Sequence, residues 1–295
     1  MLSSPAALAD LIGLRVADLS LWLDTRGSGI DVALPACHTQ FLRDGLPDGG
    51  LVLYVRDGTL PSTEGWHPIH DQSETWQLWQ DERGRYIFVA PEVCPPRRHV
   101  VVDPDFAAGE VIGEFALGTN VTPAVYPLQN LEIKVFANWL AGFGDLVLHA
   151  VGIDLGGAGY CFAGRSGAGK STLAAALMAA GGATMLGDDN LALRYLEDRF
   201  RIFGTPWHQD PARCSPHGAP LERFFFLDRN GDPGVKPLKP VDGIARLLQT
   251  AFIPYYRQDA MPTILERLSL LAEAVPFYTL SYRLGDDVMA LIREA

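Results

Sequence analysis

Cysteine is scarce in this sequence of 295 residues. Its four cysteines, Cys37, Cys94, Cys161 and Cys214, are widely spaced and form no C-x-x-C pair. Zinc sites and disulfide frameworks usually place cysteines at short, regular spacings. We therefore expect neither kind of site, and we expect reduced thiols in a reducing compartment.

Long apolar runs and an excess of basic charge are also lacking. No run approaches the roughly 20 apolar residues of a membrane-spanning helix, and the first residues, MLSSPAALADLIGL, lack the basic segment and apolar core of a signal peptide. The 24 Lys and Arg against 35 Asp and Glu give a formal net charge of −11. We expect a cytoplasmic protein that binds no membrane and no nucleic acid. A small anionic substrate is still compatible, because a local cluster of positive groups can oppose the overall charge.

The first 120 residues or so have the pattern of β-structure. Gly49–Gly58 and Arg98–Asp105 are short apolar runs rich in β-branched residues and closed by turn residues. Thr75–Pro91 contains two alternating runs joined by Asp-Glu-Arg-Gly, which predicts a β-hairpin. The pattern changes near Pro127, where Leu128–Gly144 has apolar residues at helical spacing and ends on glycine. We therefore predict a smaller β-rich N-terminal domain over residues 1–125 and a second domain over residues 126–295.

Strands and helices alternate in the second domain. Asp145–Gly167 predicts a strand, a Gly-rich turn and a buried strand, and Lys170–Gly182 predicts a helix that two glycines end. Ala183–Leu186 would be the next strand, with Gly-Asp-Asp at its C-terminal end. The remaining predicted elements are the strand in Leu221–Val235, helices in Asp242–Phe252 and Ala260–Ala274, the strand in Val275–Leu284 and the helix in Gly285–Ala295. This alternation predicts the α/β class.

A phosphate-binding motif lies between the predicted buried strand and the helix after it. The motif has the form G-x-x-x-x-G-K-[ST], and its fixed positions are Gly164, Gly169, Lys170 and Ser171. Glycines let successive backbone N–H groups point at one anion, and the N-terminus of the following helix adds partial positive charge. Lys170 would reach the β- and γ-phosphates, and the Ser171 hydroxyl would bind Mg²⁺. The predicted nucleotide-binding residues are Gly164, Arg165, Ser166, Gly167, Ala168, Gly169, Lys170, Ser171 and Thr172.

Two adjacent carboxylates, Asp188 and Asp189, follow this motif closely. Two carboxylates beside phosphate need a cation between them, so the pair implies Mg²⁺. One carboxylate could hold the metal while the other accepts a proton from an attacking hydroxyl. Taken alone, the pair would favour a structural interpretation, a helix N-cap with a solvated neighbour. Its proximity to the phosphate motif favours the functional interpretation.

The stretch His149–Leu193 resembles the catalytic domain of the HPr kinase/phosphatase family. In that family a histidine-bearing strand precedes the loop strand, and an Asp-Asp pair follows the loop helix. The resemblance implies a P-loop kinase domain, ATP and Mg²⁺ as cofactors, a serine-type hydroxyl as acceptor and a homo-oligomer. It assigns the base to Asp188, a place near the metal to Asp189 beside Ser171, and an electrostatic or positional role to His149. Phosphoenolpyruvate carboxykinases share this architecture but resemble the chain less.

Two departures separate this chain from family members that act on HPr. Those members have Glu directly after the loop serine, where this chain has Thr172, and they have a Glu-x-Arg-Gly signature that is absent from Arg201–Leu227. Both departures argue against HPr as the acceptor and against the reverse, phosphate-consuming reaction. The chain resembles instead the divergent relatives found with ribosomally made, lasso-type peptides, which implies a peptide serine as acceptor.

Other candidates and other functions stay open from the sequence. Trp207, His208 and Asp210 could line the acceptor or base side of a cleft, or they could pack and face solvent. Lys236, Lys239 and Arg246 could stabilise a phosphoryl group, although a solvated face explains them as well. The acceptor could be a peptide, a protein or a small-molecule hydroxyl. Other possible functions are a carboxykinase-like phosphoryl transferase, an ATPase, or a nucleotide-dependent binding module without catalysis.

Overall fold

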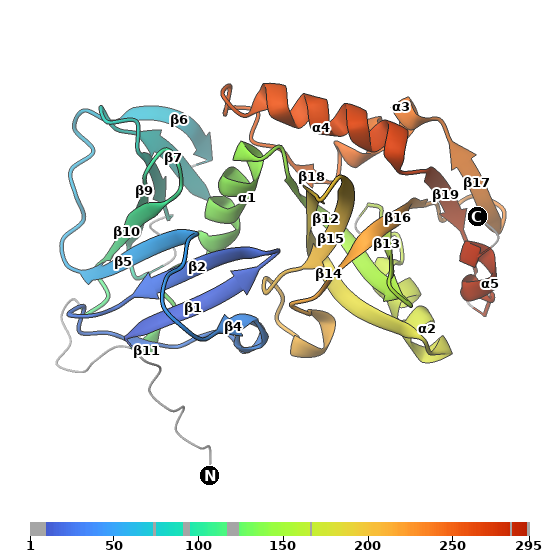
Figure 1. Cartoon of the computed structure of the whole chain (residues 1–295), viewed down its shortest axis with the longest axis horizontal. Coiled ribbons are helices and arrows are strands. Elements are labelled where there is room, and N and C mark those ends of the chain that lie inside the picture. Colours follow the sequence, from blue (N-terminus) through green and yellow to red (C-terminus); the bar gives the residue numbers. More distant parts are fainter. Residues whose placement is uncertain are drawn as a thin grey trace, which may run out of the picture. The chain divides into compact units, whose positions relative to one another are not determined.

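The computed structural model describes residues 10–72, 75–90, 95–116, 124–165, 167–283 and 285–293. The chain divides into two compact units, Met1–Phe136 and Ala137–Ala295, and Figure 1 colours their elements along the sequence. The division falls inside helix α1 (Glu132–Gly142). Within the described residues, no helix is long and apolar enough to cross a membrane.

The first unit is built on a nine-stranded sheet in the order β4-β1-β2-β5-β10-β9-β8-β7-β6. Antiparallel pairs predominate in it, and β5 runs parallel to both β2 and β10. Strands β3 and β11 form a separate two-stranded pair. The elements are β1 (Leu11–Val16), β2 (Leu19–Asp24), β3 (Asp31–Val32), the 3-10 helix η1 (Ala36–Phe41), β4 (Leu42–Arg43), β5 (Leu51–Asp57), β6 (His67–Gln72), β7 (Trp76–Gln80), β8 (Tyr86–Val89), β9 (Arg98–Val102), β10 (Ala108–Gly113) and β11 (Ala124–Val125).

The predicted hairpin is confirmed in this unit. Strands β7 and β8 pair antiparallel, with Gln77 opposite Val89 and Gln80 opposite Tyr86. The Asp81 side chain closes the turn by accepting hydrogen bonds from the backbone N–H groups of Arg83 and Arg85, at 3.0 and 2.9 Å. The turn is therefore fixed by an aspartate that the sequence places at its first position.

The second unit mixes helices with a largely antiparallel sheet. Its strand order is β13-β12-β14-β15-β16-β19-β17, with β18 on β12, and an additional β13–β16 pairing closes β12, β13, β16, β15 and β14 into a ring. The elements after α1 are β12 (Leu146–Leu155), β13 (Ala158–Ala163), α2 (Lys170–Ala180), β14 (Ala183–Leu196), β15 (Arg199–Gly204), η2 (Pro211–Arg213), β16 (Gly218–Leu227), β17 (Gly234–Leu238), α3 (Pro240–Leu247), β18 (Ala251–Phe252), α4 (Met261–Ala274), β19 (Phe277–Ser281) and α5 (Val288–Arg293). The helices predicted for this half of the chain are all present.

Strand β16 separates two apolar clusters because its side chains alternate between faces. Phe225 stacks on Phe162 and lies in one cluster with Leu173 and Leu177 of α2. Phe224 and Phe226 lie in the other cluster with residues of α4, among them Ile264. The aromatic run Phe224–Phe226 thus lies buried in the strand that the sequence predicts within Leu221–Val235, and α2 and α4 cover opposite faces of it.

Strand β14 corrects the prediction that a strand ends at Leu186. It runs through the aspartate pair to Leu196 and pairs antiparallel with β12 from Ala183 to Leu193. The register between the two strands shifts at one point. Gly152 lies opposite Gly187, but the next residue, Ile153, lies opposite Met185, so Leu186 is an extra residue without a partner on β12. A β-bulge of this kind lets a strand continue past a glycine that resembles a turn signal.

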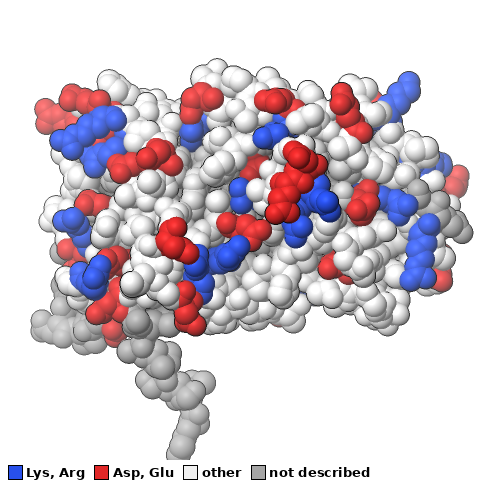
Figure 2. Space-filling view, viewed as in Figure 1, with Lys and Arg blue, Asp and Glu red and all other residues white. Residues whose placement is uncertain are grey.

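Charge is finely mixed on the face shown in Figure 2, where acidic and basic side chains alternate over short distances. Among the residues that the structure describes, no large area with a single sign of charge is visible on this face.

Candidate functional site

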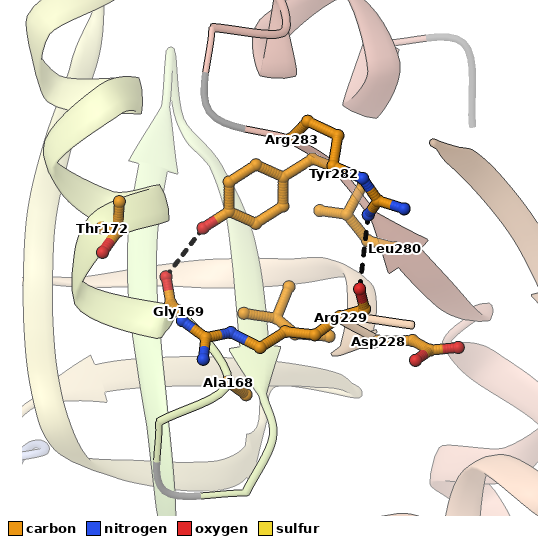
Figure 3. Close-up of a pocket in the computed structure, with 9 residues that line it drawn as sticks. Ala168, Gly169, Thr172, Asp228, Arg229, Leu280, Tyr282 and Arg283 are labelled. Atoms are coloured by element: carbon orange, nitrogen blue, oxygen red, sulfur yellow. Dashed lines mark hydrogen bonds between the residues drawn. The ribbon is translucent and has the colours of Figure 1, made fainter. Parts of the chain in front are cut away.

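The phosphate motif lies between β13 and α2, in the context that its sequence predicts. Gly169 is the N-cap of α2 and has a φ of 96° in the left-handed region. The Tyr282 hydroxyl donates to the Gly169 carbonyl at 2.9 Å (Figure 3), and a Cβ at position 169 would lie 2.9 Å from that hydroxyl oxygen. Gly167 also has a positive φ, 75°. The loop therefore needs glycine at both positions. Ser166, directly before Gly167 in the motif, lies outside the described residues.

Lys170 begins α2 and turns its amine back over the loop. Its Nζ donates to the Gly164 carbonyl at 2.9 Å, and the residue is buried. Burial lowers the pKa of Lys170 below its usual 10.5, and the carboxylates of Asp189 and Asp188 oppose this shift. The amine therefore lies between the loop backbone and two acidic groups, where an anion could replace the loop carbonyl as its partner.

Asp188 is buried, and other side chains bind both of its oxygens. The Ser171 hydroxyl donates to Oδ1 at 3.1 Å, and the guanidinium of Arg213 donates to Oδ2. Arg213 belongs to η2 and also pairs with the exposed Asp210, with Nε and Oδ2 3.5 Å apart. Ser171 in the first turn of α2 and Arg213 in η2 thus both donate to the Asp188 carboxylate on β14.

Asp189 has a different partner and is more accessible. Nδ1 of His149 lies 2.8 Å from its Oδ1, and the two side chains are 48% and 46% exposed. The Asn190 side-chain amide donates to the other oxygen, Oδ2, at 2.9 Å. Asp189 also has a φ of 141°, which is rare for a residue with a Cβ and typical of strained positions at functional sites.

These groups meet in one cavity of about 400 Å³ in the second unit. It is lined by His149, Gly167, Gly169, Lys170, Ser171, Thr172, Asp188, Asp189, His208, Arg213 and Arg229. Of the weaker candidates, His208 lies in this lining, while Lys236, Lys239 and Arg246 are exposed and do not belong to it. Most of the predicted residues are therefore brought together.

The contacts group the predicted residues differently from the pairing that the sequence suggested. The Ser171 hydroxyl donates its hydrogen bond to Asp188, although the sequence predicted that Ser171 and Asp189 share the metal. Asp189 is contacted by His149 instead. Arg213 and Arg229, which sequence reasoning did not assign to the site, both line the cavity. Neither arginine belongs to a recognisable motif, so their proximity to the loop follows only from the fold.

The residues present fit a magnesium ion bound together with phosphate. Mg²⁺ prefers oxygen ligands and is commonly held by one or two carboxylates plus substrate phosphates. Ser171 and Asp188 offer a hydroxyl and a carboxylate side by side. In the part of the chain that the structure describes, no group of three or more His, Cys, Asp or Glu residues could hold a metal by itself. Any metal here would therefore need ligands from a bound phosphate as well.

Comparison with known proteins finds distant likeness among solved structures. No family model matches the sequence, and no curated protein matches it. Among solved structures, the Hpr(Ser) kinase/phosphatase from Coxiella burnetii matches at 14% identity and a TM-score of 0.32, covering 50% of this chain and 94% of that one. The chain thus has a distant structural similarity to a kinase/phosphatase, too weak to support a function, which must be inferred from the cavity itself.

Proposed function

We propose that the protein is a Mg²⁺- and ATP-dependent kinase that transfers the γ-phosphoryl group to a hydroxyl, namely a serine of a peptide or protein. The observation that carries the proposal is the convergence of the phosphate loop and two carboxylates on one cavity, with Lys170, Ser171, Asp188 and Asp189 all in its lining. A loop with a structural role alone would have no use for this set.

The loop and the start of α2 hold the phosphates. The N–H groups of a helix's first turn have no acceptor inside the helix, so those of α2 are available to phosphate oxygens. Lys170 exchanges its bond to the Gly164 carbonyl for the β- and γ-phosphates. Ser171 and Asp188 lie 3.1 Å apart and would hold Mg²⁺ between them and the phosphates. When bound, the ion neutralises phosphate charge.

Asp189 and His149 are the proton-handling pair in this proposal. The Asp189 carboxylate is half exposed in the cavity, so an incoming hydroxyl can reach it, whereas Asp188 is buried with both oxygens occupied. His149 orients Asp189 through the 2.8 Å contact between its Nδ1 and Oδ1. This assignment exchanges the roles that the sequence resemblance gave to the two aspartates.

The reaction then proceeds as an in-line transfer. The acceptor oxygen forms a bond to the γ-phosphorus while the bond from that phosphorus to the β–γ bridging oxygen breaks, and ADP leaves. The hydroxyl proton passes to Asp189. Transfer of this kind depends mainly on positioning and charge stabilisation, so a small set of residues suffices. A serine acceptor is supported by the sequence resemblance, and a small-molecule hydroxyl is the alternative that the experiment separates from it.

The test uses γ-labelled ATP and Mg²⁺ with three acceptor sets: serine-bearing peptides, small hydroxy compounds and HPr. Wild type is compared with Asp188→Asn, Asp189→Asn and the control Asp198→Asn, which changes an exposed aspartate in the turn between β14 and β15. We expect label on a peptide serine, loss of transfer with retained Mg²⁺-ATP binding in Asp189→Asn, and weaker Mg²⁺-ATP binding in Asp188→Asn.

Each other outcome rejects a specific part of the proposal. Undiminished transfer by Asp189→Asn removes Asp189 as the base. If Asp188→Asn loses transfer but keeps its affinity for Mg²⁺-ATP, the roles predicted from the sequence are restored, with Asp188 as the base and Asp189 near the metal. Phosphate released without any acceptor indicates an ATPase, and bound nucleotide that is never consumed indicates a binding module.

A further inference from the structure

A second cavity, of about 320 Å³, lies beside the phosphate loop and is not used by the proposed transfer. It is lined by Ala168, Gly169, Thr172, Leu227, Asp228, Arg229, Leu280, Tyr282 and Arg283 (Figure 3). Gly169, Thr172 and Arg229 also line the first cavity. The two cavities therefore adjoin at the start of α2.

The second cavity lies where three parallel strands end. Strand β16 runs parallel to both β13 and β19, with Phe224 opposite Cys161 on one side and Phe277 on the other. The segments that follow these strands provide most of the lining: the phosphate loop after β13, Asp228 and Arg229 after β16, and Tyr282 and Arg283 after β19. In α/β folds, ligands bind at the carboxyl ends of parallel strands.

The lining combines apolar surface with a few polar groups, as small-molecule sites generally do. Leu280 is buried and Leu227 is half-buried, and the Tyr282 ring faces the loop. Arg283 donates from Nη1 to the Arg229 carbonyl at 3.3 Å and from Nη2 to the Gly231 carbonyl at 3.0 Å. Its planar guanidinium is thus held in place at the cavity, and such a group stacks well on an aromatic ring.

The Arg229 side chain is exposed, and within the described residues its guanidinium has no hydrogen-bond or ion-pair partner. It lines both cavities, together with the exposed Thr172 on the first turn of α2. A ligand that begins in the second cavity and passes these two residues reaches Lys170 and Ser171 in the first. Its first part would contact apolar and arginine side chains, and its second part would have to be anionic.

We propose that the second cavity is the nucleoside subsite of the donor: it binds the base and ribose of a nucleoside triphosphate, and Arg229 contacts the phosphate chain where the cavities meet. The inference rests on the proposed function, since it concerns the same nucleotide. Beyond the proposed transfer, it assigns residues that recognise the base and ribose, the part of the nucleotide that does not react. Leu227 and Arg283 contact the nucleoside, whereas Lys170 and Arg229 contact phosphate.

Calorimetric titration of the full chain with Mg²⁺-ATP and with Mg²⁺-tripolyphosphate tests this division, because tripolyphosphate lacks the nucleoside. We expect wild type to bind ATP at least tenfold more tightly than tripolyphosphate. Leu227→Glu and Arg283→Ala should each lose at least tenfold in ATP affinity and stay within about twofold for tripolyphosphate. Arg229→Ala should weaken both ligands. The control Arg293→Ala, on the exposed side of α5, should change neither.

Retained tripolyphosphate binding also shows that a variant is folded, so loss of ATP affinity alone has a local cause. Equal affinity of wild type for the two ligands overturns the subsite while leaving the proposed function intact, and so does unchanged ATP binding in both Leu227→Glu and Arg283→Ala. If Leu227→Glu fails to fold, Arg283→Ala decides. Wild type that binds neither ligand overturns the proposed function itself, and the subsite with it.

Discussion

A buried histidine in the first unit makes a quantitative prediction about stability and pH. His99 lies on β9, is 6% exposed and contacts the Trp66 ring edge-on at 5.5 Å between ring centroids. Burial, together with the nearby charge of Arg97, lowers the pKa of His99 from 6.5 to about 4. The folded protein therefore keeps this imidazole neutral at pH values at which the unfolded chain protonates it.

The sign and size of the effect follow from linkage. Between pH 6.5 and about 4 the unfolded state binds one proton more than the folded state at this position, so stability falls as the pH falls. Each pH unit in this window changes the free energy of unfolding by about 1.4 kcal/mol. The stability that His99 contributes to the free energy of unfolding is fully present above pH 6.5, and about 3 kcal/mol of that free energy is lost by pH 4.

Urea unfolding of wild type and His99→Leu, each at pH 7.5 and 4.5, isolates this contribution, because all other titrating groups are common to both. We expect the loss of stability between the two pH values to be smaller in the variant by about 2–3 kcal/mol. The exposed histidine of β6 provides the control His67→Leu, which should match wild type. An NMR titration that places the His99 pKa near 6.5, or equal pH dependence of wild type and His99→Leu, would refute the reasoning.

Three further predictions concern the second unit. Gly169→Ala forces a Cβ into the left-handed region beside the Tyr282 hydroxyl, so we expect at least tenfold weaker Mg²⁺-ATP binding by calorimetry and a stability loss of only about 1–3 kcal/mol; unchanged binding contradicts this. Arg194→Met leaves the buried Asp145 without its 2.7 Å partner, so urea unfolding should show a loss of about 3–5 kcal/mol, and a loss below about 1 kcal/mol counts against it. The Cys161 thiol is fully buried, and burial raises its pKa; mass spectrometry after thiol labelling should therefore find Cys161 unmodified in the native protein and modified only in urea.

Elements specified by neighbouring residues could be predicted from the sequence. The β7–β8 hairpin follows from two alternating runs and an aspartate-led turn. Helix α2 follows from its alanines and leucines and from the glycines on either side. The phosphate motif dictates its own context, because its glycines, lysine and serine function only between a strand and a helix. In each case the signal lies within about one element's length of chain.

Features that depend on distant parts of the chain could not be predicted. Arg213 reaches Asp188 across 25 positions of sequence, and Tyr282 reaches Gly169 across 113. An arginine in a polar loop or a tyrosine after a strand resembles many others in sequence, so nothing marks either residue as a neighbour of the phosphate loop. The closure of the second unit's strands into a ring likewise depends on the β13–β16 pairing, which joins segments about 60 residues apart.

The error at β14 has a physical cause that also explains the geometry of the cavity. Adjacent side chains of a regular strand point to opposite faces of the sheet, so Asp188 and Asp189 would diverge on an undistorted β14. The bulge at Leu186 and the φ of 141° at Asp189 break this regularity, and both carboxylates line one cavity. One is buried against Ser171 and the other is half exposed beside His149. A strand that ended at Leu186 would lose the β12 pairing opposite the aspartates, so the continuation of β14 is what holds the two carboxylates in different environments beside the same loop.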